Sequence, residues 1–295
     1  MLQPEAQLAV GGNPGPPPGQ GPPPGAGPPP GVGPHFLTAI AFEHDAGGLG
    51  DEDIAFIKRD GSGLHIRTAP TSRERTPQWS PDGRQLVFAS NQPGNFDIFV
   101  SSGDGSNAIN VTNTPGVDEF APDWSPDGGK LVFSFTGGGV GLAVVNADGS
   151  ERQTVSTSID FEPAWSPDGS SIAFNRTENG NVDIYIMSSD GSTLTRLTTD
   201  PAVDARPAWS RDGSQIAFET FRDGNWEIYV MDSDGDGQTN VTNSPQQEFR
   251  ANWSPGAKIV FDRLTQIFAI NPDGTGIEMI PNLPAGFNVS ADWSR

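Results

Sequence analysis

The sequence contains no cysteine and only three histidines, which lie at positions 35, 44 and 65. Without cysteine the chain has no disulfide bonds, no thiolate metal sites and no cysteine nucleophile. It also contains no HExxH motif, no close histidine pair and no GxSxG motif. Because those motifs hold catalytic zinc or position hydrolase nucleophiles, their absence argues against both kinds of enzyme.

Basic residues are scarce as well: 17 Lys and Arg stand against 37 Asp and Glu, for a formal net charge of −20. A surface of this charge repels phosphate backbones and anionic lipids. No apolar run approaches the ~18 residues that a membrane-spanning helix needs. The first ten residues, MLQPEAQLAV, lack the basic and apolar regions of a signal peptide. We therefore expect no nucleic-acid partner, no membrane insertion and no visible signal peptide.

Proline and glycine are concentrated in residues 11–36, where the unit GPPPGx occurs three times. Its glycines do not fall at every third residue, which excludes a collagen helix, and polyproline II is the expected conformation. At ~3.1 Å per residue the stretch from 11 to 34 reaches roughly 75 Å as a semi-flexible arm. Ahead of the arm, residues 1–10 include Glu5–Val10, which is either a strand that adds to a sheet edge or a frayed terminus.

The rest of the chain, residues 37–295, is a repeat marked by tryptophan. Tryptophans followed by serine recur every 40 to 45 residues, at positions 79, 124, 165, 209, 253 and 293. The first four lead into SPDG or SRDG, sequences that suit a type I β-turn. A short apolar strand such as Leu86–Phe88 follows, then a third strand such as DIYIM at 183–187, a DG turn and a weaker fourth strand. Four strands per ~40–45 residues are typical of propeller blades.

The two ends of the repeat complement each other. It starts at a second strand, AIAF at 39–42, and stops after a first strand, ADWS at 291–294. A ring closed by the C-terminal strand leaves no open sheet edge. We therefore predict an all-β fold, a six-bladed β-propeller with four-stranded blades, preceded by the extended Pro/Gly-rich arm.

The pattern P-x-W-S-P-D-G, followed by IAF, DIYVM, DGS and LT, resembles the repeat of the TolB-type propeller family over about residues 37–295. The resemblance implies the six-bladed fold. It leaves function open, since such propellers occur as periplasmic interaction proteins, as domains of prolyl-oligopeptidase-type enzymes, in pectate-type lyases and in large surface proteins. The chain differs from the periplasmic TolB protein in having the proline arm instead of a separate N-terminal α/β domain.

One acidic turn is a candidate calcium site. Asp232, Asp234 and Asp236 alternate with Ser and Gly in the sequence DSDGDG, a spacing that opens a calcium-binding loop. The twelfth position is Asn243 instead of the usual Glu, so the local bidentate ligand is missing. We expect either a structural Ca²⁺ here or an elaborated DG turn between two strands.

A second acidic pattern recurs five residues before the tryptophans. Its members are Glu74, Glu119, Asp160, Asp204 and Glu248, with Asn288 in the sixth copy. Equivalent positions in a propeller form a ring, which predicts an acidic ring near one mouth of the central channel that could hold a cation or basic partner residues. The alternative is that each side chain bonds backbone N–H groups of its own inter-blade connection.

Three functional hypotheses follow. The first is a non-catalytic protein-binding or assembly module, in which the arm tethers a rigid propeller to a protein partner or to a neighbouring subunit. Arm-to-neighbour contacts are heterologous and would produce a ring or a filament. The second is a metal-dependent, lyase-like enzyme at the channel mouth, and the third is an accessory domain of a hydrolase system. We expect an extracellular or cell-envelope protein, with Ca²⁺ as the one candidate cofactor.

Overall fold

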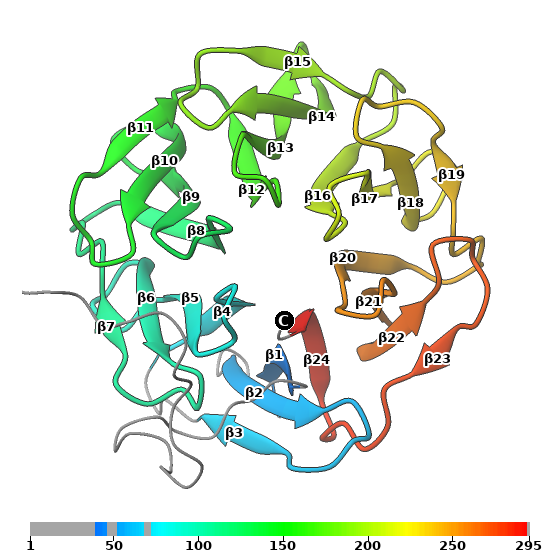
Figure 1. Cartoon of the computed structure of the whole chain (residues 1–295), viewed down its shortest axis with the longest axis horizontal. Coiled ribbons are helices and arrows are strands. Elements are labelled where there is room, and N and C mark those ends of the chain that lie inside the picture. Colours follow the sequence, from blue (N-terminus) through cyan, green and yellow to red (C-terminus); the bar gives the residue numbers. More distant parts are fainter. Residues whose placement is uncertain (1–38, 46–51, 68–71, 294–295) are drawn as a thin grey trace, which may run out of the picture. The chain divides into compact units, whose positions relative to one another are not determined.

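The computed structural model describes residues 39–45, 52–67 and 72–293. These residues form six four-stranded antiparallel sheets, arranged around a common axis as the blades of a propeller (Figure 1). The predicted strand at Glu5–Val10 and the predicted arm at 11–36 lie outside the described residues. Within the described part of the chain, no helix is long and apolar enough to cross a membrane.

The blades are numbered along the chain, and in each the inner strand, nearest the axis, is given first. Blade 1 contains β24 (Phe287–Trp293), β1 (Ala39–Asp45), β2 (Asp53–Lys58) and β3 (His65–Arg67). Blade 2 contains β4 (Glu74–Trp79), β5 (Gln85–Ser90), β6 (Asp97–Ser102) and β7 (Ile109–Asn110). Blade 3 contains β8 (Asp118–Trp124), β9 (Lys130–Thr136), β10 (Val140–Asn146) and β11 (Gln153–Ser156).

The second half of the ring repeats this order. Blade 4 contains β12 (Asp160–Trp165), β13 (Ser171–Glu178), β14 (Asn181–Ser188) and β15 (Leu194–Arg196). Blade 5 contains β16 (Asp204–Trp209), β17 (Gln215–Thr220), β18 (Glu227–Asp232) and β19 (Thr239–Asn240). Blade 6 contains β20 (Glu248–Trp253), β21 (Ile259–Arg263), β22 (Gln266–Ile270) and β23 (Glu278–Met279).

Blade 1 is built from both ends of the repeat, as predicted. Strand β24 pairs antiparallel with β1, so that Trp293 lies opposite Ile40 and Asn288 lies opposite His44. The C-terminal strand β24 is thus the inner strand of blade 1, and it closes the ring. This closure leaves no open sheet edge between the last blade and the first. The prediction of six blades closed by the C-terminal strand is confirmed.

The SPDG turns bond to themselves. In blade 2 the carbonyl of Ser80 accepts the Gly83 N–H at 2.9 Å, while the Ser80 hydroxyl donates to Asp82 at 2.7 Å. Gly83 has a positive φ of 67°, which glycine adopts without a Cβ clash. The same bonds recur at Ser125, Ser166 and Ser210. These turns connect the inner strand to the second strand on one face of the ring, which we call the turn face.

The core lies between neighbouring blades. Between blades 1 and 2, for example, Phe56 packs with Trp79 and Phe88, all of them buried. The DG turns add a backbone contact: a Cβ on Gly149 of blade 3 would lie 2.4 Å from the carbonyl oxygen of Val111 in blade 2. Because a sheet of this kind buries its faces only against its neighbours, the six blades stabilise one another.

Candidate functional site

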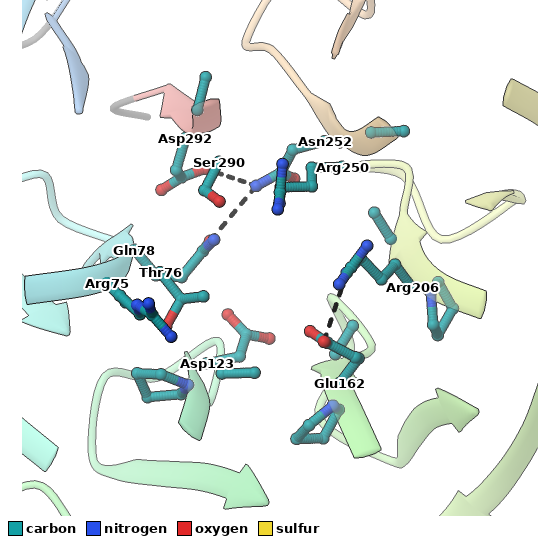
Figure 2. A pocket seen from close by; sticks show the side chains of 18 of the residues that line it. Arg75, Thr76, Gln78, Asp123, Glu162, Arg206, Arg250, Asn252, Ser290 and Asp292 are labelled. Carbon is teal, nitrogen blue, oxygen red and sulfur yellow. Dashed lines mark hydrogen bonds and ion pairs between the residues drawn. The ribbon is translucent and has the colours of Figure 1, made fainter. Parts of the chain in front are cut away.

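A central cavity of about 980 Å³ lies on the propeller axis. Residues of all six inner strands line it, and Figure 2 shows polar side chains from several of these strands directed toward the same space. The inner strands are the elements whose geometry determines which side chains reach the cavity.

Each inner strand is interrupted by a β-bulge. Its pairing with the second strand shifts register, for example between Phe161 and Ala164 in β12. At the bulge, three residues before the tryptophan, stands a non-glycine residue with a positive φ, which we call the bulge residue. The bulge residues are Thr76 (49°), Ala121 (48°), Glu162 (55°), Arg206 (51°), Arg250 (55°) and Ser290 (55°). All six line the cavity, so the bulge is the device that aims one side chain per blade at the axis.

Most of these strained residues are held by the preceding blade. The residue directly after the second-strand phenylalanine offers a side-chain acceptor to the bulge N–H of the next blade. The bonds run from Thr76 to Glu43 (2.7 Å), from Glu162 to Ser134 (3.1 Å), from Arg206 to Asn175 (3.3 Å), from Arg250 to Glu219 (3.0 Å) and from Ser290 to Asp262 (3.0 Å). Opposite Ala121 the corresponding residue is Ala89. We did not recognise these acceptors in the sequence, although their fixed place after the phenylalanine was visible there.

Ion pairs fill one side of the cavity. The guanidinium of Arg206 donates to Glu219 at 2.6 Å. It also donates to Glu162 at 3.3 Å (Figure 2). Burial alone would lower the pKa of Arg206, but Glu219 and Glu162 outweigh burial and raise it. In the next blade Arg250 donates to the buried Asp262 at 3.2 Å. Arg206 and Arg250 are therefore held in place on this side of the cavity by the buried carboxylates of Glu219 and Asp262.

The carboxyl groups behind the bulges are buried acids. Burial, with a smaller contribution from the charge of Glu43, raises the pKa of Asp262 to about 7 despite the neighbouring Arg250. Burial is also the main cause that raises the pKa values of Glu43 and Glu219. These groups accept backbone N–H bonds and meet arginines, which explains why charged side chains are tolerated at such depth.

A second set of polar residues lies directly before the tryptophans. Asp123 accepts the backbone N–H of Trp165 at 2.7 Å. Near the opposite wall, Asn252 donates to Asp292 at 2.9 Å and to Gln78 at 3.3 Å, which joins three inner strands in one network (Figure 2). The cavity thus presents carboxylates, amides and guanidinium groups in fixed positions.

The structure does not bring the predicted acidic ring together around the cavity. The five carboxylates are buried at the starts of the inner strands, and they are not among the residues that line the cavity. Each meets an arginine: Glu74 with Arg67, Glu119 with Arg152, Asp160 with Arg176 (2.7 Å), Asp204 with Arg222 (3.0 Å) and Glu248 with Arg263 (2.7 Å). Asn288 bonds His44 at 3.0 Å. A cation at this ring stays a prediction, and it would have to compete with these arginines.

The predicted calcium turn connects β18 and β19. Asp232, Asp234 and Asp236 are exposed there, and the Asp234 carboxylate accepts the Asp236 N–H at 3.1 Å. The plain turn of blade 2 closes in the same way, since Asp104 accepts the Ser106 N–H at 2.9 Å. Among the described residues no group of three or more His, Asp or Glu side chains is placed to hold a metal ion. Bound calcium stays a prediction.

The two described histidines lie away from the cavity. His44 is buried against Asn288, and His65 stacks on Phe56 with ring centroids 6.0 Å apart. Neither of them lines the cavity. His35 lies outside the described residues.

Fold and cavity together define a closed six-bladed propeller with a polar central cavity. The model of the TolB β-propeller domain matches residues 134–282, and the chain belongs to this family. No curated protein sequence matches the chain.

Solved structures share the fold. TolB from Acinetobacter baumannii superposes with a TM-score of 0.75 at 19% identity, over 90% of this chain and 68% of that one. A candidate TolB from Agrobacterium tumefaciens gives a TM-score of 0.67 at 21% identity, over 87% of this chain and 91% of that one. An oligogalacturonate lyase from Vibrio parahaemolyticus gives 0.55 at 16% identity, over 83% of this chain and 74% of that one. At these identities the likeness concerns the fold alone.

Proposed function

We propose that the chain is a non-catalytic protein-binding module whose central cavity receives part of a partner protein. The observation that carries this proposal is the ring of bulge residues, in which six positions share one backbone geometry but hold five different residue types. A non-glycine residue in the left-handed region costs on the order of 1–3 kcal/mol. Five of the six are stabilised by an acceptor from the preceding blade. A strained backbone that is retained while its side chains vary is expected where those side chains contact a ligand.

Size and chemistry also support a protein partner. A cavity of about 980 Å³ is large enough for several side chains of a partner segment. Its walls mix the charges of Glu162 and Arg206 with the amides of Gln78 and Asn252 and with the ring of Phe161. Such walls recognise a peptide segment by hydrogen bonds and charge, and they contain no histidine among the described residues.

Two further parts of the proposal rest on the sequence. The arm at 11–36 serves as a tether to a partner or to a neighbouring subunit, because proline-rich segments bind with little ordering cost. We also propose an extracellular or cell-envelope location. The metal-dependent lyase and the hydrolase accessory domain remain alternatives, and no specific observation at the cavity favours either of them.

The test uses a variant that places a large side chain in the cavity and requires no backbone conformation that the same residue type does not already adopt at an equivalent position. Ala121→Arg places at blade 3 the residue type that blades 5 and 6 already carry at Arg206 and Arg250. The matched control is Ile109→Arg on the outermost strand β7, where the side chain is 66% exposed. A photo-crosslinking residue at position 121, and separately at 109, then reports contacts in the native cells.

We expect position 121 to crosslink to a discrete protein that position 109 does not reach. Ala121→Arg should prevent capture of this protein, whereas Ile109→Arg should leave capture intact. Identical adducts at both positions, or capture that survives Ala121→Arg, would contradict binding through the cavity.

A further inference from the structure

Two pairs of aromatic side chains in tilted contact lie on the face opposite the turn face. This hairpin face carries the hairpins between second and third strands and the connections between blades. Phe96 lies 5.3 Å from Phe120, and Trp226 lies 5.9 Å from Phe249, with an interplanar angle of 46° in both pairs. All four rings are half-buried, so that each pair presents part of its surface to solvent.

The aromatic pairs occupy equivalent places in the repeat. Phe96 and Trp226 directly precede the third strands β6 and β18, while Phe120 and Phe249 directly follow the buried acids of β8 and β20. One pair lies at the junction of blades 2 and 3 and the other at the junction of blades 5 and 6. These junctions are on opposite sides of the ring (Figure 1).

Equivalent hydrogen bonds hold the backbone beside both pairs. The Glu119 N–H donates to the carbonyl of Phe96 at 2.8 Å, and the Glu248 N–H donates to the carbonyl of Trp226 at 2.9 Å. An asparagine at the preceding position braces each hairpin: Asn95 donates to Val117 at 2.8 Å, and Asn225 donates to Gln246 at 2.7 Å. The pairs are therefore rigid, and binding on them orders little further structure.

Other contacts enlarge the apolar surface. Phe221, 43% exposed, lies edge-on to Trp226 at 5.6 Å. On the other pair the guanidinium of Arg75 lies 5.3 Å from the centre of the Phe96 ring. Rigid aromatic surfaces with nearby polar groups are the surfaces on which polyproline II segments bind, because proline rings pack on aromatic faces.

The chain supplies a segment of that kind. Residues 11–34 contain three GPPPG units and no charged residue. In a chain of net charge −20, an uncharged segment approaches the acidic surface of another copy without repulsion. At ~3.1 Å per residue it reaches roughly 75 Å in the polyproline II conformation, enough to contact several blades.

The direction of β1 favours the aromatic pairs of a neighbouring copy over those of the same copy as the binding site of the arm. Ala39, the first described residue after the arm, lies beside Ile40, which pairs with Trp293 at the turn face. The aromatic pairs lie on the hairpin face, at the other end of the inner strands. When two copies stack head to tail, the turn face of one copy, where the described residues begin at Ala39, meets the hairpin face of the next.

We propose that the aromatic pairs Phe96–Phe120 and Trp226–Phe249 bind the proline-rich arm of a second copy. The inference rests on the tether role given to the arm above. Of the four aromatic residues, Phe120 also lines the cavity, whereas Phe96, Trp226 and Phe249 do not. Because the donor and acceptor surfaces differ, the contact is heterologous and repeats from copy to copy.

Sedimentation velocity of the full chain over a wide concentration range tests the proposal. The wild type should assemble with increasing concentration, and the double variant Phe96→Ser, Trp226→Ser should assemble at least about 10-fold more weakly. The matched control is Leu264→Ser, since Leu264 is an apolar residue 70% exposed on another hairpin of the same face. It should assemble like the wild type.

A peptide of residues 11–34 gives a second measurement that needs no variant to fold. In excess it should dissolve the wild-type assemblies, whereas a peptide of equal length with serine for every proline should not. The proposal is overturned if the wild type is monomeric at every concentration, which includes the case of an arm bound to its own copy. It is equally overturned if assembly persists in the double variant and in the presence of the peptide.

Ala121→Arg separates this inference from the cavity function. It should leave assembly unchanged, because Ala121 belongs to neither pair and Phe96, Trp226 and Phe249 do not line the cavity. Loss of the cavity partner with intact assembly is therefore the result that both proposals predict for this variant. Capture that survives Ala121→Arg contradicts the cavity function alone, and a wild type that is monomeric at every concentration contradicts the arm contact alone.

Discussion

Two repeated features adjoin the inner strands, the SPDG-type turn in blades 2 to 5 and the bulge in all six blades, and they differ in how their residues are used. The turn keeps nearly the same residues, and its side chains bond within the turn: the Asp127 carboxylate accepts the Ser125 hydroxyl at 2.6 Å and the Gly129 N–H at 2.9 Å. The bulge keeps only its backbone geometry, while its side chains range from Ala121 to Arg206 and reach the cavity. Repeated identity marks residues that hold the fold, and variation at a fixed geometry marks residues free to determine binding.

The largest loss of stability is expected from substitution of the repeated tryptophan, which lies between the bulge and the turn along the chain. Trp124 is 1% exposed, packs in the core between blades 2 and 3, and donates to the Gln78 carbonyl at 3.2 Å. Trp124→Ala should lower the free energy of unfolding by about 3–5 kcal/mol. Urea denaturation measures this, with Ile109→Ala on the exposed outer strand as the control. A loss below about 1 kcal/mol would remove the tryptophan from the set of residues that hold the fold.

The acceptors behind the bulges should give a pH dependence. Asp262 has a pKa of about 7 in the folded chain, above its ordinary value, because it is buried. The folded state therefore binds this proton more tightly, and the contribution of Asp262 to the free energy of unfolding should fall as pH rises from about 4 to 7, by at most about 1.4 kcal/mol per pH unit.

Asp262→Asn should reduce that slope, since it removes the titrating group and leaves an acceptor for the Ser290 N–H. Urea unfolding at pH 5, 6 and 7 provides the comparison. Asp273→Asn is the control, because hydrogen bonds from Thr275 lower the pKa of that exposed carboxyl and move its titration below this range. Parallel pH profiles for wild type and Asp262→Asn would disprove a buried titrating acid behind the bulge.

A smaller effect is expected within the turn. The Asp127 carboxylate accepts the Ser125 hydroxyl at 2.6 Å and the Gly129 N–H at 2.9 Å. Asp127→Ala should cost about 1 kcal/mol in thermal or chemical unfolding, because both donors turn to water. Asp127→Asn retains one acceptor oxygen and should cost less. Equal losses in the two variants would show that the acceptor does not matter.

The smallest effect on stability should come from the bulge side chain itself. Ala121→Arg changes only the atoms that enter the cavity, and we expect the free energy of unfolding to change by less than about 0.5 kcal/mol. Its effect on partner binding should nevertheless be the largest of these variants. Strong destabilisation in urea would mean that the bulge residue serves packing more than recognition.

Much of the fold could be predicted from the sequence, because it depends on local signals that recur. Tryptophan followed by Ser-Pro-Asp-Gly indicates a strand that ends in a type I turn, and the placement of Ala39–Phe42 and Ala291–Ser294 at the two ends indicates closure. The bulges could not be predicted in this way. Glu162 and Arg250 adopt a positive φ although neither is glycine, so the sequence carries no local sign of the bulge. The conformation is stabilised by an acceptor from another blade.

The same difference between local signals and contacts between distant residues explains why the acidic residues, but not their partners, could be predicted. The recurrence of Glu74, Glu119, Asp160, Asp204 and Glu248 was visible in the sequence, but their partners were not, because the arginines stand at different places in the repeat: Arg67 in β3, Arg176 in β13 and Arg152 before β11. A charge pair forms wherever the fold brings opposite charges together, and it needs no fixed spacing along the chain.

The amino-acid sequence by itself determined the number of blades, their strands and turns, and the closure of the ring, since each follows from local propensity and from a repeat that buries apolar faces. Only the tertiary structure decided which side chains reach the axis. That choice depends on bonds between blades, such as the one from Arg250 to Glu219, and on the burial that raises the pKa of Asp262. Both exist only when distant parts of the chain are packed together.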